Sequence, residues 1–357
     1  MTHIPVMQPR FPDLANVLSR FRAISDSGVF SNFGPQVKAL EARYADFLGT
    51  VPEKVVLVAN ATVGITASIQ ALGGDKWVVP SWTFSATVAG TLAARVDVTL
   101  ADITPESQWV KEPSGADTTE GVVKVAPFGS GFSTDVFSKH GRVVVDAAAS
   151  IAAPLPPLRL LPASNCVVFS LHATKVLGIG EGGIVVCGSS QLADEIRSRT
   201  NFGFDSSRES QVIGTNSKMS EFAAAIGHAV LDNWPGEKDE WLEARATVKS
   251  LSTPLEHLAF KPSTEVINPY WIVLFNSAQE REKVENALAD QKIQSRRWWA
   301  NGAHRMPAYQ NLASNGLFST DSISERYLGL PFFRGITRPQ VERVVSVVEE
   351  SLEARGA

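Results

Sequence analysis

The stretch "FSLHATKVLGIGEGG", residues 169–183, places one lysine, Lys175, between an apolar run and a cluster of glycines. The apolar run "NCVVFS" (165–170) leads into this stretch, and a second one, "GIVVC" (183–187), follows it. Continuous apolar runs of this length are typical of strands that are covered on both faces. The sequence therefore predicts an amine at the edge of a buried sheet, where burial lowers the pKa of a lysine and keeps it nucleophilic.

Similar short apolar runs occur earlier in the chain. They are "KVVLVA" (54–59), "KWVVP" (76–80), "RVDVTLA" (95–101), "GVVKVA" (121–126) and "RVVVD" (142–146). Helix-like segments, "TVGITASIQALG" (62–73) and "FSATVAGTLAA" (84–94), lie between the first of these runs. Strands that alternate with helices predict an α/β fold with a mostly parallel sheet flanked by helices.

After Ser189 the pattern becomes helical, with the segments "SQLADEIRSRTN", "KMSEFAAAIGHAVLDNW" and "EKDEWLEARATVKSL". The break "WPGEKD" at Pro235 predicts a hinge between a large domain, residues 1–235, and a smaller domain, residues 236–357. The strand-like run "PYWIVLF", a helix and the closing helix "PQVERVVSVVEESLEA" follow the break. They predict a smaller C-terminal α+β domain.

The composition argues against several kinds of partner. Lysine and arginine number 33, aspartate and glutamate 37, and the formal net charge is −4. The basic residues are scattered, so we expect no nucleic acid partner. No stretch approaches the roughly 20 apolar residues of a membrane span, and no secretory signal is recognisable, so we expect a cytoplasmic protein without membrane contact. Cys166 and Cys187 lie in apolar runs and are predicted to be buried free thiols, with no metal bound.

Ligands of an open parallel sheet bind beyond the carboxyl ends of its strands. Polar or aromatic side chains follow four strand-like runs: Asn60, Ala61 and Thr62; Trp82 and Phe84; Asp146; and Ser170, His172 and Lys175. A helix start holds phosphate, an aromatic ring covers a flat cofactor, and a carboxylate keeps a pyridinium nitrogen protonated. Together with a nucleophilic lysine, these groups are what pyridoxal phosphate needs.

Each of these residues also has an ordinary structural interpretation. A lysine after a strand usually extends to solvent, an aspartate there usually caps a turn, and a lone histidine or phenylalanine is more often structural. The glycines of "GIGEGG" precede a strand and so do not fit a dinucleotide-binding motif. The ordered combination is what favours a cofactor site.

The whole series of motifs resembles the sugar aminotransferases of the DegT/StrS type, which are fold-type I pyridoxal phosphate enzymes. The resemblance extends from about residue 28 to residue 350. It includes "SNFGPQVKALEARYADFLG", "VANATVGITASIQALG", "VVPSWTFSATVAGTLAA", "VVVDAAAS", "RSRTNFGF", "NSKMSEFAAAIGHAVLDN" and "LGLPFF". Its most specific part is the lysine block with the Gly-Glu-Gly-Gly that follows.

The resemblance implies a role for individual residues. Lys175 matches the Schiff-base lysine, Ser170 and the turn at Ala61 and Thr62 match the phosphate-binding groups, and Asp146 matches the partner of the pyridinium nitrogen. Phe84 matches the ring-stacking aromatic, with Trp82 left as an alternative. Asn216 matches an asparagine that reaches the phosphate of the neighbouring subunit, which implies a homodimer with shared active sites. The large domain, with its N-terminal arm, is the part expected to bind the cofactor.

Two departures from the family pattern affect these expectations. Ala149 stands where the family usually has glutamine or histidine, so a contact with the phenolic oxygen of the cofactor is missing or is supplied by Ser150 or water. Phe332 and Phe333 lie where the family often has a histidine, which puts the substrate contacts there in doubt.

The resemblance also implies an activity. Retention of Lys175 favours amino transfer over the dehydration catalysed by relatives that have histidine there. The expected donor is L-glutamate, and the expected acceptor is a nucleotide-linked keto-deoxysugar. The stretch "SRRWWANGAHRMPAY" resembles one in aminotransferases that act at C4 of dTDP-4-keto-6-deoxyglucose. This predicts a role in amino-sugar biosynthesis, for example of lipopolysaccharide or O-antigen.

Candidate substrate-binding residues are His172, Lys218, Arg296, Arg297 and His304. Paired arginines suit carboxylates and phosphates, although a solvated basic turn is an equal alternative. Two other functions stay open at this stage: a pyridoxamine-dependent sugar dehydratase, and a non-catalytic nucleotide-binding or regulatory protein on the same fold. The combination of Lys175, Asp146 and Ser170 argues against the binding protein, which needs no activated amine.

Overall fold

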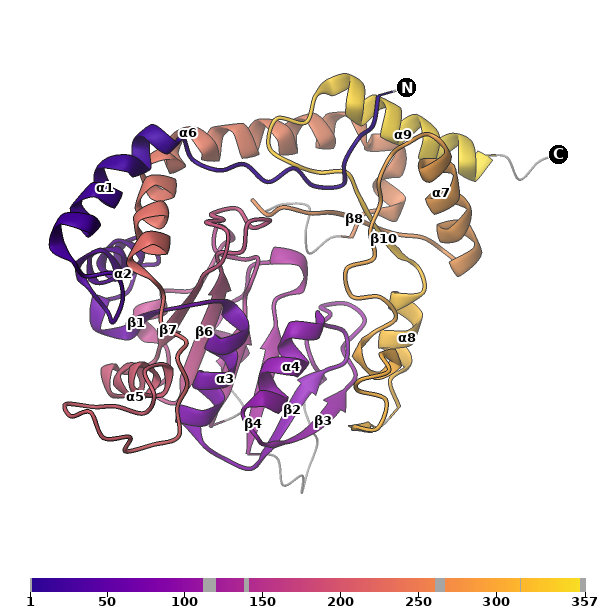
Figure 1. Cartoon of the computed structure of the whole chain (residues 1–357). Coiled ribbons are helices and arrows are strands. Elements are labelled where there is room, and N and C mark those ends of the chain that lie inside the picture. Colours follow the sequence, from indigo (N-terminus) through magenta and orange to yellow (C-terminus); the bar gives the residue numbers. More distant parts are fainter. Residues whose placement is uncertain (1, 112–119, 138–140, 261–266, 315, 354–357) are drawn as a thin grey trace.

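The computed structural model describes residues 2–111, 120–137, 141–260, 267–314 and 316–353 (Figure 1). An eight-stranded sheet forms its centre, in the order β1-β7-β6-β5-β4-β2-β3-β9. The strands are β1 (Val55–Val58), β2 (Lys76–Pro80), β3 (Asp97–Ala101), β4 (Gly121–Val125), β5 (Val143–Asp146), β6 (Asn165–Ser170), β7 (Gly183–Cys187) and β9 (Ala313–Ser314). All pairings in this sheet are parallel except those of β7, which runs antiparallel to both β1 and β6. The predicted α/β fold and its mostly parallel sheet are thus confirmed.

The strands are apolar throughout because helices cover both faces of the sheet. In β1, Val55 and Leu57 belong to a core that also contains residues of α2 (Pro35–Phe47) and α6 (Glu221–Leu251). The alternate residues, Val56 and Val58, belong to a second core with residues of the helices on the other face. Those helices are α3 (Ala61–Leu72), α4 (Ser85–Ala93) and α5 (Ser190–Thr200). Residues alternate in direction along a strand, so a strand between two helix layers has no polar face.

Helix α6 corrects one expectation from the sequence. It continues through Pro235 without interruption for 31 residues, where two separate helices were predicted. A proline removes one hydrogen bond of a helix and often bends it, but packing on both sides of the proline can hold the helix together. Trp241 and Val248, beyond the proline, are buried in the same core as Ala224 before it. The predicted domain boundary at residue 235 therefore falls inside a helix, and the division into domains stays a prediction.

The C-terminal part forms a second, smaller layer. Strands β8 (Trp271–Leu274) and β10 (Tyr327–Leu330) pair antiparallel, and α7 (Ala278–Asp290) and α9 (Arg338–Glu353) lie beside them (Figure 1). The N-terminal segment joins this part, because the Ile4 N–H donates to the carbonyl of Lys292 and the Ile4 carbonyl accepts from Gln294. Helix α1 (Leu14–Ser27) then carries the chain to the other end of α6.

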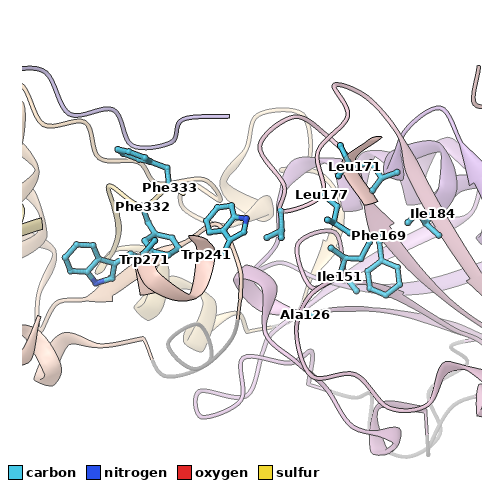
Figure 2. Packing of buried hydrophobic residues seen from close by; sticks show 14 of the residues in the cluster. Ala126, Ile151, Phe169, Leu171, Leu177, Ile184, Trp241, Trp271, Phe332 and Phe333 are labelled. Carbon is cyan, nitrogen blue, oxygen red and sulfur yellow. The ribbon is translucent and has the colours of Figure 1, made fainter. Parts of the chain in front are cut away.

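The apolar core continues from the sheet into the C-terminal part (Figure 2). Phe169 and Leu171, on the sheet side, share it with Trp241 and Phe332 on the other side. Cys166 and Cys187 are buried free thiols, as predicted, and they pair with each other across β6 and β7. Among the described helices, none is long and apolar enough to span a membrane.

Candidate active site

A cavity of about 790 Å³ lies at the carboxyl ends of the central strands, between the sheet and the C-terminal part. It brings together nine of the residues predicted for the site: Ala61, Thr62, Phe84, Asp146, Ser170, His172, Lys175, Arg296 and Arg297. These residues are far apart in the sequence. They meet because the carboxyl ends of parallel strands share one edge of the sheet.

The start of α3 forms one end of the cavity. Asn60 caps this helix, its side-chain oxygen accepting a hydrogen bond from the Val63 N–H at 3.1 Å. The N–H groups of Ala61 and Thr62 belong to the first turn, so the helix provides them with no partner. They are free to bind an anion, and the helix dipole favours one there. A Cβ at Gly183 would lie 2.7 Å from the Asn60 carbonyl carbon, so a glycine at this position allows β7 to approach the helix start.

Asp146, at the end of β5, supplies a buried carboxylate. Its side chain accepts hydrogen bonds from the Thr87 hydroxyl at 2.7 Å and the Ala148 N–H at 3.1 Å. Burial raises the pKa of Asp146, while these two hydrogen bonds and the charge of Lys175 lower it. Among the described residues, no salt bridge joins Asp146 to a cation. A carboxylate can accept about four hydrogen bonds, so this one retains the capacity to bind a cationic N–H.

Lys175 lies in the tight loop between β6 and β7. Its N–H donates to the His172 carbonyl at 2.8 Å, and its own carbonyl accepts from the Gly178 N–H at 3.1 Å. A Cβ at Gly178 would lie 2.7 Å from the Ala173 carbonyl oxygen, so this turn leaves no space for a side chain there. The Lys175 amine donates a hydrogen bond to the Tyr270 hydroxyl at 2.8 Å. The glycines that follow the lysine in the sequence therefore shape the loop that aims it into the cavity.

The structure distinguishes the two candidate ring-stacking aromatics. Phe84 lines the cavity and is 50% exposed, so it offers a flat apolar face there. Trp82 is 1% exposed, donates its indole N–H to the Gln108 side chain at 3.0 Å and packs edge-to-face on Trp299. Trp82 belongs to the core behind the cavity, which leaves Phe84 as the available aromatic.

Ala149 and Ser150, shortly after Asp146, differ in their access to the cavity. Ala149 lines the cavity with a methyl group, at the position where the resemblance led us to expect glutamine or histidine. Ser150 is fully buried, its hydroxyl has no hydrogen-bond partner among the described residues, and it does not line the cavity. Of the alternatives considered from the sequence, Ser150 is therefore not placed to supply the missing contact.

The basic residues near the cavity differ in how they are bound. Arg296 is exposed at the cavity wall, whereas Arg297 donates to the Ser324 carbonyl at 2.7 Å and to the Asn301 side chain. His172 lies 3.8 Å from Glu181, which also lines the cavity. Arg296 is thus more available to a ligand than Arg297.

Three predicted residues do not reach this cavity. His304 pairs with the Ser81 hydroxyl at 2.7 Å and with Asp321 at 2.9 Å. Lys218 donates to the Asn201 side chain at 2.7 Å, and burial lowers the pKa of its amine. Asn216 is exposed on the same loop region, outside the cavity of its own chain. Their roles in binding stay predictions.

Three residues at the site were not predicted from the sequence. Tyr270 binds the Lys175 amine, Thr87 binds the Asp146 carboxylate, and Glu181 lies beside His172. Thr87 lies inside a helix-like segment and Tyr270 just before a strand, so neither position signals a site. Glu181 had a signal, because it lies within the lysine block.

The cavity residues fit pyridoxal phosphate. The free N–H groups of α3 and the Ser170 hydroxyl suit the phosphate, and the buried Asp146 carboxylate suits a protonated ring nitrogen. Lys175 lies at the same cavity with its amine directed inward, and Phe84 provides a flat face. The Asp146 carboxylate forms no salt bridge within the described part of the chain, and this is the strongest of these observations, because a bound pyridinium would offset the cost of its burial.

Fold and cavity together define a pyridoxal phosphate enzyme of fold type I. A profile of the DegT/DnrJ/EryC1/StrS aminotransferase family matches residues 14–349, and the chain belongs to this family. The predicted family, the fold class, the aminotransferase class and the pyridoxal phosphate cofactor are thereby confirmed.

Individual relatives match over nearly the whole chain. One is the dTDP-4-amino-4,6-dideoxy-D-glucose transaminase of Shigella dysenteriae, 27% identical over 97% of this chain and 98% of that protein. Another is the dTDP-3-amino-3,4,6-trideoxy-alpha-D-glucose transaminase of Streptomyces venezuelae, 27% identical over 97% of each chain. The crystal structure of DesI in the presence of its TDP-sugar product is similar with a TM-score of 0.88 at 30% identity, over 99% of this chain and 94% of that one.

Proposed function

We propose that this protein transfers an amino group from L-glutamate to the 4-keto carbon of a dTDP-linked 4-keto-6-deoxyhexose, using pyridoxal phosphate. The single observation that carries the proposal is the convergence of Lys175, Asp146, Ser170 and the start of α3 on one cavity. The relatives that act on or bind dTDP-sugars support the substrate class. In this reaction glutamate becomes 2-oxoglutarate and the keto group becomes an amine.

In this proposal, separate residues bind the phosphate, cover the ring, keep the ring nitrogen protonated and transfer protons. The α3 N–H groups and the Ser170 hydroxyl hold the phosphate, and Phe84 covers the ring. Pyridoxal phosphate, when bound, supplies an electron sink for the carbon that exchanges its amino group. Asp146 keeps the ring nitrogen protonated, which maintains that sink. Lys175 carries protons to and from the reacting carbon as the general acid and base.

The substrates bind toward the loop that follows Ile293. Arg296 lines the cavity and is exposed, so it is the cation we assign to the sugar-nucleotide diphosphate or to a glutamate carboxylate. Trp298 also lines the cavity and supplies an apolar surface for a sugar or a base. The two half-reactions use one cavity in turn, so the donor and acceptor share these groups.

A second copy of the chain completes the site in this proposal. Asn216 and Lys218 lie outside their own cavity. The chain also exposes large apolar side chains near them, with Phe202 44% exposed and Ile213 71% exposed. Exposed apolar surface of this kind marks interfaces. We infer a homodimer in which Asn216 reaches the phosphate site of the partner subunit.

The test of the activity is direct. Purified protein with pyridoxal phosphate is given L-glutamate and dTDP-4-keto-6-deoxyglucose, and the products are measured by mass spectrometry and NMR. We expect 2-oxoglutarate and a dTDP-4-amino-4,6-dideoxyhexose in equal amounts. In a parallel assay with a dTDP-3-keto-6-deoxy sugar, amino transfer to C3 and none to the 4-keto sugar would correct the position. Loss of water without amino transfer would favour the dehydratase. Cofactor that never binds would favour the non-catalytic binding protein.

The test of the shared site uses two defective variants. Lys175→Ala removes the reacting amine of one cavity, and Asn216→Ala weakens the phosphate contact that its own subunit makes with the partner. A mixed dimer then has one cavity with both defects and one with neither. We expect the mixture to be more active than either variant alone. An activity equal to the average of the two separate variants would contradict the shared site. The predicted cytoplasmic location and the setting in lipopolysaccharide or O-antigen biosynthesis stay predictions.

A further inference from the structure

We propose that Tyr270 is a positioning residue for Lys175: its hydroxyl accepts a hydrogen bond from the lysine amine and holds that amine at the cavity. The inference rests on the proposed role of Lys175 as the reacting amine. Tyr270 lies just before β8, in the C-terminal part, so the contact joins the two parts of the chain at the reacting atom.

The contact is specific to the hydroxyl group. The Lys175 amine donates to the Tyr270 hydroxyl oxygen at 2.8 Å, while it lies 5.4 Å from the centre of the ring. The amine is therefore hydrogen-bonded at the edge of the phenol and does not sit over the ring face. A hydrogen bond from a charged donor is stronger than a neutral one, and its direction fixes where the amine points.

The side chains of Asn268 and Arg245 hold the backbone of Tyr270 by hydrogen bonds. Its N–H donates to the Asn268 side chain at 2.9 Å, and its carbonyl accepts from the Arg245 guanidinium at 2.9 Å. Arg245 also donates to the Asn268 side chain at 3.1 Å and lies 4.0 Å from the ring centre of Phe332. Burial lowers the pKa of Arg245 to about 10. Arg245 is half-buried, and partial burial of a guanidinium is costly, so its hydrogen bonds to this short turn indicate that the position of the turn matters.

Two aromatic rings pack against the ring of Tyr270. Trp298 packs against it edge-to-face at 5.0 Å, and Phe128 does so at 5.6 Å. Phe128 itself has a φ of +48°, a conformation that a bulky residue rarely adopts. With the ring and the backbone both held, the hydroxyl has little freedom to leave Lys175.

Several other titratable and charged groups lie near the Lys175 amine. The titratable and charged side chains that line the same cavity are Asp146, His172, Glu181, Tyr270, Arg296 and Arg297. Asp146 interacts with Lys175 through its charge. Of these groups, Tyr270 is the one in the described structure that forms a hydrogen bond to the amine. Removing its hydroxyl changes the environment of the amine without changing the charge of the cavity.

The expected effect of removing the Tyr270 hydroxyl follows from the direction of the hydrogen bond, in which the Lys175 amine is the donor. The phenol oxygen accepts a hydrogen bond from the amine and so stabilises the ammonium form. Without the hydroxyl, the ammonium loses that bond and faces a more apolar wall. Tyr270→Phe should therefore allow the Lys175 amine to react with an amine reagent at lower pH than in the wild type.

The experiment uses the full chain freed of cofactor, so the readout does not depend on catalysis. Trinitrobenzenesulfonate modifies neutral amines, and the rate at Lys175 is followed by mass spectrometry of its peptide across a pH series. We expect the midpoint of the modification rate for Tyr270→Phe to lie at lower pH than the midpoint for the wild type. Tyr309→Phe is the matched control, because Tyr309 bonds Ser85 at 2.8 Å and lies outside the cavity. Its midpoint should equal that of the wild type.

A second variant guards against a folding defect in the first. Asn268→Ala removes the acceptor of the Tyr270 N–H and should lower the midpoint in the same direction by a smaller amount. Wild-type midpoints in both variants, or a shift to higher pH in Tyr270→Phe, would overturn the proposal.

Steady-state kinetics of the holoenzyme give a separate measurement. Tyr270→Phe should lower kcat about tenfold and leave the KM for the sugar unchanged, because the lost contact is to the reacting amine and not to the substrate. A raised KM with an unchanged kcat would contradict the positioning role. If instead the wild-type Lys175 never links to pyridoxal phosphate, the proposed function fails while the titration result still stands on its own.

Discussion

The sheet edge and the loop at residues 295–305 face the same cavity, but they differ in how their polar side chains are used. At the sheet edge, Asp146, Ser170 and Lys175 all face the cavity. In the loop, Arg297 and His304 form hydrogen bonds to other protein groups, and Arg296 remains the exposed cation at the wall. Ligand-binding side chains were predicted from the sequence in both regions. The structure leaves most of them available to ligands at the sheet edge, but fewer in the loop.

The difference has a structural cause. A strand satisfies its own backbone through the sheet, so a polar side chain at its end is free to serve a ligand. A long connection has to satisfy its backbone and dock onto the sheet by other means. His304 does this by joining Ser81, after β2, to Asp321 of α8 (Phe318–Ser324). Polar residues in loops therefore need a structure before they can be assigned to ligands.

The largest effect should come from the sheet edge. Lys175→Ala should abolish the visible absorption of the bound cofactor and lower kcat at least about a thousandfold, because the nucleophile and the proton carrier are both lost. Absorption spectra and initial rates check this. Lys283→Ala, an exposed position on α7, is the control and should keep both properties. An absorption band retained in Lys175→Ala would show that Lys175 is not the amine that links to the cofactor.

A second large effect is expected at Asp146. Asp146→Asn should lower kcat/KM about a hundredfold, because the ring nitrogen loses its charged partner. Activity assays at saturating pyridoxal phosphate check this. Activity within a few-fold of the wild type would show that the carboxylate is structural.

The same variant tests the pH dependence of stability in the absence of cofactor. Burial raises the pKa of Asp146 in the folded chain. A carboxyl group with a raised folded pKa contributes most below its unfolded pKa, about 4, and this contribution is lost as pH rises through the folded pKa. The stability of the wild type relative to Asp146→Asn should therefore fall from about pH 4 toward neutrality. Chemical unfolding across this range measures it, and a constant difference would contradict the burial effect.

An intermediate effect should separate the two arginines of the loop. Arg296→Ala should raise the KM for the nucleotide sugar about tenfold with little change in stability, since the side chain is exposed. Arg297→Ala should lower the free energy of unfolding by about 2 kcal/mol, because bonds to Ser324 and Asn301 are lost. Kinetics and urea unfolding of both variants check this. A loss of stability in Arg296→Ala together with a raised KM in Arg297→Ala would contradict this assignment.

The smallest effect on activity is expected at His304. His304→Ala should lower the free energy of unfolding by about 1–2 kcal/mol, because the bonds to Ser81 and Asp321 are lost, and should change kcat/KM less than about threefold. Urea unfolding and kinetics measure the two quantities. A tenfold rise in KM at an unchanged free energy of unfolding would indicate that His304 binds the substrate.

The sequence was sufficient for seven of the eight strands of the sheet, and insufficient for the edge strand β9 and for the contacts across the cavity. Buried strands are readable because their residues are apolar on both faces, as in β1 and β6. The continuity of α6 through Pro235 was not readable, since packing on both sides of the proline overrides the local signal. Tyr270 was not readable either, because its importance lies in a contact with Lys175, 95 positions away. Long-range contacts of this kind have no local pattern.

The most direct test of the central claim is to locate the covalent bond between the protein and the cofactor. Holoenzyme is treated with borohydride, which makes the link permanent, and is then digested and mapped by mass spectrometry. We predict one pyridoxyl phosphate per chain, on the peptide that contains Lys175. A label on another lysine, or no label on a protein that binds the cofactor, would contradict the convergence of the strand ends on a single reacting amine.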